Sequence, residues 1–186
     1  RRDRRLYKCI KIGSQVWMAE NLAFIPKNCP HYLKEGIWVY NYYNSPTIAA
    51  RNFDSYKMYG CLYDWKTAQE VAPHGWHLPS DSEWKELESY LGMTKIELNS
   101  TGYRGNEEAN ALKLNGETNF NVLLGGVYRD SFDNYSKSTG FWCCDTDEEG
   151  SPWIRNFHRF YKGIDRQVTW PNFGYYVRCI KDNSSI

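Results

Sequence analysis

The chain has 186 residues, 17% of them aromatic, including 15 Tyr and 8 Trp, and its formal net charge is +1. This length is enough for one domain with a full core. The near-neutral charge gives no electrostatic basis for a nucleic-acid or membrane-surface partner, and no apolar run approaches the ~18 residues of a membrane-spanning helix. The excess of Tyr and Trp is typical of recognition surfaces that are part apolar and part wet.

We expect a single domain over residues 6–182, with a basic tail at 1–5 and a short tail at 183–186. In the first part of the domain, two short runs flank Gly13-Ser14. Because Gly tolerates positive φ, this pattern predicts a β-hairpin with a two-residue turn. Trp17, in the second arm, is expected to serve the core.

Residues 26–58 are irregular, with three prolines and the aromatic run "IWVYNYYN". They predict a long loop that holds a short strand, and long loops in compact domains are often functional. The next stretch, 59–71, carries Leu62, Trp65 and Ala68 at helical spacing. It predicts a helix that ends before Pro73, with Trp65 as a structural residue.

The stretch "GWHLPSDSEWKELESYLG", residues 75–92, predicts a second helix. Ser80 is a favourable N-cap, and Glu83 three residues later completes a capping box. The apolar face of this helix begins at Trp84, and Gly92 is a natural stop.

The approach to this helix contains two histidines, His74 and His77, on either side of Gly75-Trp76. Structural zinc sites normally need four ligands, and no third ligand is placed by the sequence, so we expect no metal here. Trp76 would instead seat the loop on the core, and His77 would hydrogen-bond nearby backbone.

A third helix is predicted over 106–116, and after Asn119 short aromatic or β-branched runs separated by turn residues predict strands. Gly125-Gly126 inside one of these runs indicates a bulge or a close backbone approach. The order of hairpin, loop, helices and antiparallel strands predicts an α+β domain whose first and last strands pair.

Six cysteines occur in the chain, without a CxxC pair, and this excludes a zinc ribbon or a thioredoxin-type motif. An even number with long spacings favours an oxidising compartment, although some could be small buried hydrophobes. Six cysteines allow about 15 full pairings, so the sequence leaves the connectivity open. The disulfide candidates are Cys9, Cys29, Cys61, Cys143, Cys144 and Cys179. On a strand, the adjacent Cys143 and Cys144 would point to opposite faces.

Five motifs, in order along the chain, resemble those of the FISUMP family, the Fibrobacter succinogenes major paralogous domain. They are "IKIGSQVWMAENL" (10–22), "YGCLYDWKTA" (59–68), "GWHLPSDSEWKELESYLG" (75–92), "GGVYR" (125–129) and "YYVRCIKD" (175–182). The resemblance covers almost the whole chain. It implies that Arg129 and Arg178, which lie in these motifs, are structural.

The family is similar to the C-type-lectin-like fold in the version seen in formylglycine-generating enzymes. The resemblance therefore implies two main helices packed on short twisted antiparallel sheets, in a loop-rich protein. It also implies a bacterial cell-surface location, as an outer-membrane lipoprotein or a secreted protein of the kind found in Bacteroidetes, with a possible lipid anchor upstream.

The chain departs from the family in two places. Many members have a Cys before "PSGWHLP", where this chain has Ala72-Pro73, so Cys179 needs another partner; Cys9 is one candidate if the terminal strands are neighbours. Members often read "WWSST" where this chain has "FWCCDT". Cys143 and Cys144 therefore stand at positions that are usually Ser.

We expect a non-catalytic module that binds a glycan or a protein at the cell surface. Trp, Tyr and Arg are the usual hot-spot residues of binding surfaces. The candidates on the late strands are Trp153, Arg155, Arg159, Tyr161, Trp170, Phe173 and Tyr175. Because alternate strand residues face the core, about half of these positions should be buried, and Arg155 and Arg178 would then pair with buried carboxylates.

Two other functions stay open. One is a metal-dependent oxidase like the formylglycine-generating enzymes, whose copper site uses two separated cysteines; the adjacent Cys143-Cys144 pair does not reproduce that spacing. The other is a receptor-binding protein diversified by a retroelement, with variation confined to about residues 140–178.

No cofactor is expected. The motifs of calcium-dependent lectins are absent, and "WPN" at 170–172 does not match them. The acidic run "DTDEEG" contains the only Ca²⁺ candidates, Asp145, Asp147 and Glu148, because carboxylates are the ligands that Ca²⁺ prefers. Such a run is more often a solvated turn.

Overall fold

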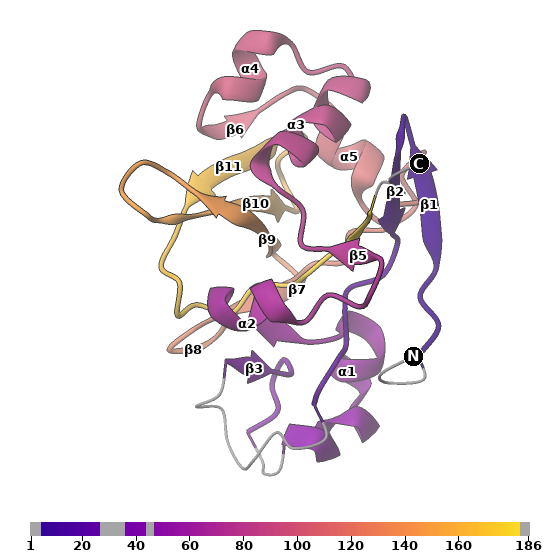
Figure 1. Ribbon diagram of the computed structural model, residues 1–186, viewed down its shortest axis with the longest axis vertical. Helices are drawn as coiled ribbons and strands as arrows, with labels where there is room; N and C mark the ends of the chain where they lie inside the picture. Colours follow the sequence, from indigo (N-terminus) through magenta and orange to yellow (C-terminus); the bar gives the residue numbers. More distant parts are fainter. Residues whose placement is uncertain (1–4, 27–35, 44–46, 183–186) are drawn as a thin grey trace.

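Three β-sheets organise the chain in the computed structural model, which describes residues 5–26, 36–43 and 47–182 (Figure 1). The largest sheet has the order β6-β11-β10-β9-β7-β8, a second has the order β1-β2-β12-β5, and β3 pairs with β4. Most neighbours are antiparallel, and β7 runs parallel to β9. With its short helices this is an α+β structure, as the sequence predicts. The tails at 1–4 and 183–186 lie outside the described residues.

The bounds of the elements are as follows. The strands are β1 (Cys9–Ile12), β2 (Gln15–Met18), β3 (Ile37–Trp38), β4 (Leu62–Tyr63), β5 (Trp76–His77), β6 (Gly102–Arg104), β7 (Gly125–Arg129), β8 (Ser131–Tyr135), β9 (Ser138–Thr146), β10 (Pro152–His158), β11 (Ile164–Val168) and β12 (Ile180–Lys181). The helices are α1 (Asp54–Tyr59), α2 (Trp65–Glu70), α3 (Asp81–Tyr90), α4 (Lys95–Asn99) and α5 (Glu108–Leu112), and a 3₁₀ helix covers Thr47–Asn52.

The predicted hairpin is confirmed. Ile12 pairs with Gln15 across a two-residue turn, and Gly13 takes a φ of +58° there. A Cβ at Gly13 would also lie 3.0 Å from the ring of Tyr90. This close contact is a second reason, besides the positive φ, why glycine suits the position. The predicted pairing of the first strand with the last is wrong: both lie in this sheet, but Ile180 of β12 pairs with Trp17 of β2, which separates β12 from β1.

The capping box of α3 is also confirmed. The Ser80 Oγ accepts the backbone N–H of Glu83 at 3.1 Å, and a carboxylate oxygen of Glu83 accepts the backbone N–H of Ser80 at 2.8 Å. Gly92, with a φ of +113°, follows the end of the helix as predicted. These contacts satisfy N–H groups that would otherwise lack partners at the helix start.

The helix predicted over 59–71 is wrong in its first half. Leu62 and Tyr63 form β4, and Tyr63 also exchanges backbone hydrogen bonds with Tyr175 at 2.9 and 3.1 Å. The helix α2 begins only after Asp64, whose carboxylate accepts the N–H of Thr67 at 2.8 Å. Burial of this strand between other elements outweighs the helical spacing of its apolar residues.

The predicted loop at 26–58 contains the expected strand, β3, and two elements that were not expected, the 3₁₀ helix and α1. The third predicted helix is shorter than expected, since α5 covers only Glu108–Leu112. Residues 27–35 and 44–46 of the loop lie outside the described residues, and Cys29 is among them.

Trp84 lies at the centre of one of two buried hydrophobic clusters. Its ring contacts four other buried rings, with centroid distances between 4.9 and 6.5 Å: Trp17, Phe120, Phe141 and Phe157. Trp17 is equally buried, and its indole N–H donates to the side-chain oxygen of Gln15 at 3.0 Å. Trp17 and Trp84 are therefore core residues, as the sequence predicts.

No disulfide joins any two of the five cysteines that the structure describes. The candidate pair Cys9–Cys179 is wrong because Cys9 lies on β1, and β2 separates β1 from β12. Cys9 is exposed and Cys179 is buried. On β9, Cys143 is buried and Cys144 is half-buried, which agrees with the expectation of opposite faces.

Candidate functional site

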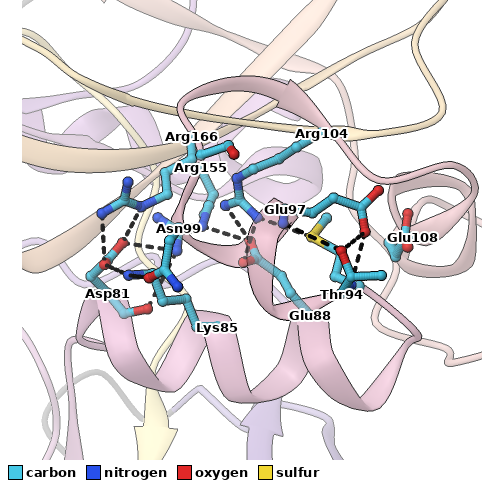
Figure 2. Close-up of polar contacts among 12 residues, drawn as sticks. Asp81, Lys85, Glu88, Thr94, Glu97, Asn99, Arg104, Glu108, Arg155 and Arg166 are labelled. Atoms are coloured by element: carbon cyan, nitrogen blue, oxygen red, sulfur yellow. Dashed lines mark hydrogen bonds and ion pairs between the residues drawn. The ribbon is translucent and has the colours of Figure 1, made fainter.

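A buried ion-pair network holds α3 against the six-stranded sheet (Figure 2). Glu88, with no exposed side-chain surface, accepts two hydrogen bonds from Arg104 at 2.9 and 3.1 Å and one from the Arg155 Nε at 2.6 Å. Glu88 therefore joins α3 to β6 and β10. Bidentate Arg–carboxylate contacts are among the stronger hydrogen bonds in proteins.

Asp81, at the start of α3, extends the network. It accepts two hydrogen bonds from Arg166 at 2.8 and 2.9 Å and pairs with Arg155 at 2.9 Å and Lys85 at 3.0 Å. Burial alone would raise the pKa of Asp81, but the hydrogen bond from Arg166 and the charge of Arg155 hold it well below its usual range. Every carboxylate here is saturated by cations, so we assign the network to the fold.

Arg155 and Tyr175, both predicted to contact a ligand, do not reach the surface. Arg155 is fully buried in the ion-pair network. This agrees with the alternative prediction, in which Arg155 pairs with a buried carboxylate. Tyr175 is fully buried against the ring of Trp142, and Arg129 donates to its hydroxyl at 3.1 Å. Both positions serve the core, where a strand places alternate side chains.

The other five predicted ligand-binding residues are partly or largely exposed, but their contacts divide them into separate groups. Trp153 lies under the guanidinium of Arg166 at 3.6 Å, and Tyr161 stacks on Tyr103 at 4.1 Å. The guanidinium of Arg129 lies 5.8 Å from the ring centroid of Phe173, and that of Arg159 lies 5.0 Å from the ring centroid of Phe160. The side chain of Trp170 is 69% exposed. None of these contacts joins one of the five residues to another, so they do not place the five on one platform.

The acidic loop likewise separates its three Ca²⁺ candidates. Asp145 is turned to α3, where it accepts the N–H of Asp81 at 2.6 Å. Asp147 accepts the N–H groups of Glu149 and Ser151 within its own turn, and with Glu148 it borders a hollow beside Trp153. Within the part of the chain that the structure describes, no three His, Cys, Asp or Glu side chains form a cluster that could hold a metal ion.

His77 binds two carboxylates and not the backbone that the sequence suggested. Its Nδ1 lies 2.6 Å from Asp182 and its Nε2 lies 2.7 Å from Glu83. Burial alone would lower the pKa of His77, but the hydrogen bonds to Asp182 and Glu83 outweigh it and raise the pKa. His77 thus ties the start of α3 to the end of the last strand.

This arrangement predicts a pH-dependent stability. A His whose folded pKa is raised stabilises the fold fully below its unfolded pKa of about 6.5, and this contribution is lost as pH rises through the higher folded pKa. Because the pair is partly exposed, we expect about 1 kcal/mol or less. Thermal unfolding from about pH 6 to about pH 9 should show the loss in the wild type and a flatter profile in His77→Gln. His74→Gln, at an exposed position nearby, should keep the wild-type profile; a wild-type profile in His77→Gln would contradict the assignment.

A cleft of about 520 Å³ opens between the loop before α1 and the edge strand β8. We call it the tyrosine cleft. Its lining residues are Tyr40, Asn41, Asn52, Phe53, Asp54, Ser55 and Tyr135. It thus combines three aromatic rings with amide, carboxylate and hydroxyl groups.

The rings of the tyrosine cleft are held by one another. Tyr40 stacks on Tyr135 with centroids 5.1 Å apart and an angle of 26°, and Phe132 supports Tyr40 from the same strand at 5.1 Å. The hydroxyls of Tyr59 and Tyr135 lie 3.2 Å apart. Gly126 is needed beneath Tyr40, because a Cβ there would lie 2.4 Å from its ring.

The phenols of Tyr40 and Tyr59 stay protonated at neutral pH. Burial, followed by the hydrogen bond with Tyr135, raises the pKa of Tyr59 to about 12. Burial also raises the pKa of Tyr40. These hydroxyls are therefore neutral donors and acceptors over the physiological range.

Six of the seven residues that line the cleft lie in the 26–58 loop, which the sequence marks as a long and therefore functional loop. Tyr135 was missed, because it comes to the cleft from a distant hairpin that the sequence did not predict.

The fold places the protein in the α+β class, with a mostly antiparallel six-stranded sheet. The chain belongs to the Fibrobacter succinogenes major domain family, whose sequence model matches residues 10–181. Neither a curated protein nor a solved structure matches the chain. Within residues 5–26, 36–43 and 47–182, no helix has the length and apolar character needed to cross a membrane.

Proposed function

We propose that this domain is a non-catalytic binding module and that its tyrosine cleft takes a glycan. The observation that carries the proposal is the combination of rings and polar groups around one hollow of about 520 Å³. That volume lies within the ~300–1,000 Å³ typical of small-ligand sites. The location would be the bacterial cell surface or the secreted fraction, and the scaffold a C-type-lectin-like fold.

The chemistry of the cleft suits a sugar. The C–H faces of a pyranose pack on aromatic faces such as the partly exposed rings of Phe53 and Tyr135. Sugar hydroxyls need donors and acceptors at the rim, and the side chains of Asn41, Asn52 and Asp54 supply both. Binding of this kind needs neither a metal nor a titrating group.

The state of the thiols on β9 supports a non-catalytic role over the oxidase alternative. Burial raises the pKa of the Cys143 thiol strongly, and burial together with the Asp145 hydrogen bond raises that of Cys144 to about 12. Thiols with raised pKa values are protonated at neutral pH, whereas the thiolate is the form that attacks substrates.

Burial also argues against a hypervariable segment at 140–178. The first six residues of β9 are buried, and so are five of the seven residues of β10. Substitutions in a close-packed core are costly, so few positions in these two strands are free to vary.

The test is a glycan and polysaccharide screen of the purified domain with and without EDTA, followed by calorimetry on any hit. Tyr135→Ala is expected to weaken binding at least tenfold, which corresponds to about 1.4 kcal/mol, because it removes one ring of the stacked pair. EDTA should have no effect.

The matched control is Tyr161→Ala, since the two side chains are almost equally exposed, at 49% and 50%. Tyr161→Ala should bind as the wild type does. Equal losses in both variants, loss of binding with EDTA, or no binding to any glycan in the screen would each overturn the assignment of the tyrosine cleft to a glycan.

A further inference from the structure

A second, smaller hollow of about 210 Å³ lies between the N-terminal hairpin, α1 and the segment 114–123. We call it the basic pocket. Its lining includes four basic residues, Arg5, Lys8, Lys57 and Arg178, and one acidic residue, Glu20. The pocket thus carries a formal charge of +3 (four positive, one negative) in a chain whose total is only +1.

Arg178 lies at the floor of the basic pocket and is 1% exposed. Its Nε donates to the side chain of Asn21 at 2.7 Å, and its terminal nitrogens donate to the carbonyls of Asn121 at 2.9 Å, Phe120, and Met18 at 3.4 Å. The ring of Phe120 lies 4.8 Å from the guanidinium. The group is held firmly, but its partners are neutral.

Arg178 differs in this respect from the other deeply buried arginines. Arg104, Arg155 and Arg166 all pair with Glu88 or Asp81, whereas no carboxylate of the described residues forms an ion pair with Arg178. Burial consequently lowers the pKa of Arg178 to about 9, and Glu20 offsets this only in part. The predicted partnership of Arg178 with a buried carboxylate is therefore wrong.

A buried charge without a counter-ion is costly, and the cost falls when an opposite charge arrives. An anion in the basic pocket would lie among Arg178, Lys8 and Lys57, whose nitrogen donors suit oxyanions. The ammonium group of Lys57 lies 3.3 Å from the exposed carboxylate of Asp54. The side chains of Asn21 and Asn121 border the same space.

We propose that the basic pocket binds a small oxyanion group, namely a phosphate, a sulfate or a carboxylate. The volume, below that of most small-ligand sites, accommodates one such group and little more. The group could be a free anion or the acidic substituent of a sugar. The basic pocket shares no lining residue with the tyrosine cleft, and the two are joined by the ion pair of Lys57 with Asp54 at 3.3 Å.

The test is a titration of the purified domain with inorganic phosphate and sulfate at constant ionic strength, with chloride as the reference, by calorimetry and by thermal unfolding. Glucuronate, set against neutral glucose, separates the sugar source from the free anion. Concentrations in the low millimolar range avoid the general stabilisation by sulfate. At one hundred times Kd, the Tm should rise by about 5 °C.

Three variants and one control make the result specific. Lys8→Met and Lys57→Met should each weaken oxyanion binding at least fivefold, since each removes one positive charge from the basic pocket. Glu20→Gln should tighten binding, because it removes the only negative charge and keeps an acceptor for the Lys8 backbone N–H. Lys66→Met, on the exposed face of α2, should have no effect.

These variants lie on the surface and leave Arg178 in place, so each is expected to fold. Confirmation requires weaker binding in Lys8→Met and Lys57→Met, tighter binding in Glu20→Gln, and no change in Lys66→Met. The proposal is overturned if chloride reproduces the response, if the lysine variants and Lys66→Met lose affinity equally, or if neither phosphate, sulfate nor glucuronate binds.

Discussion

Replacing Glu88 with Ala is expected to lower the free energy of unfolding by about 3–5 kcal/mol. Glu88 is fully buried and accepts three hydrogen bonds from two arginines, Arg104 and Arg155, of which Arg155 is also fully buried. Removing the carboxylate leaves these guanidinium groups in the core with part of their charge uncompensated. The variant loses the attraction between the charges and also keeps the desolvation penalty of the buried guanidinium groups. Both effects lower the free energy of unfolding, so we expect this to be one of the most destabilising single substitutions in the chain.

Urea unfolding of the purified variants would measure the effect. Glu88→Gln keeps the volume and one acceptor but loses the charge, so its cost should fall between those of the wild type and Glu88→Ala. Glu70→Ala, at an exposed position on α2, should change the free energy by no more than about 0.5 kcal/mol. If Glu88→Ala lowers the free energy of unfolding no more than Glu70→Ala does, the ion-pair network contributes nothing to stability.

Replacing Trp84 with Ala should cost a similar amount, about 3–5 kcal/mol. The indole is fully buried among four rings, and its removal leaves a cavity that the surrounding side chains can fill only in part. Denaturant unfolding with unchanged slope and a lower midpoint is the expected readout.

Trp84→Phe provides a sharper comparison. The indole N–H of Trp84 has no hydrogen-bond partner among the residues that the structure describes, whereas that of Trp17 donates to Gln15 at 3.0 Å. Trp84→Phe should therefore destabilise less than Trp17→Phe, which removes a buried hydrogen bond and leaves the Gln15 oxygen unpaired. If Trp84→Phe lowers the free energy of unfolding as much as Trp17→Phe, or more, then ring packing and not hydrogen bonding determines the stability at both positions.

Features that depend on neighbours in sequence could be predicted from the chain alone. The turn at Gly13-Ser14 and the capping box of Ser80 and Glu83 each involve residues at most three apart, and their chemistry is fixed by local geometry. The order of the predicted elements extended this to the α+β class, which the structure confirms.

Features that depend on distant pairing could not be predicted. Residues 62–63 have helical spacing but become β4, because Tyr63 meets Tyr175 across the fold. Arg155 looked like a surface contact, yet Glu88 and Asp81 come from another segment and draw it into the core. The tyrosine cleft joins a loop to a hairpin for the same reason. In each case long-range contacts outweigh local propensity.

The pairing of β2 with β12 has a mechanical consequence. β1 and β12 both run antiparallel to β2 and so point the same way, so that the chain enters β1 at one end of this sheet and leaves β12 towards the other. A force that pulls the ends apart would act along the strands and load their hydrogen bonds together in shear, not one after another. The sheet would thus act as a clamp that resists tension while the sites elsewhere on the domain keep their shape.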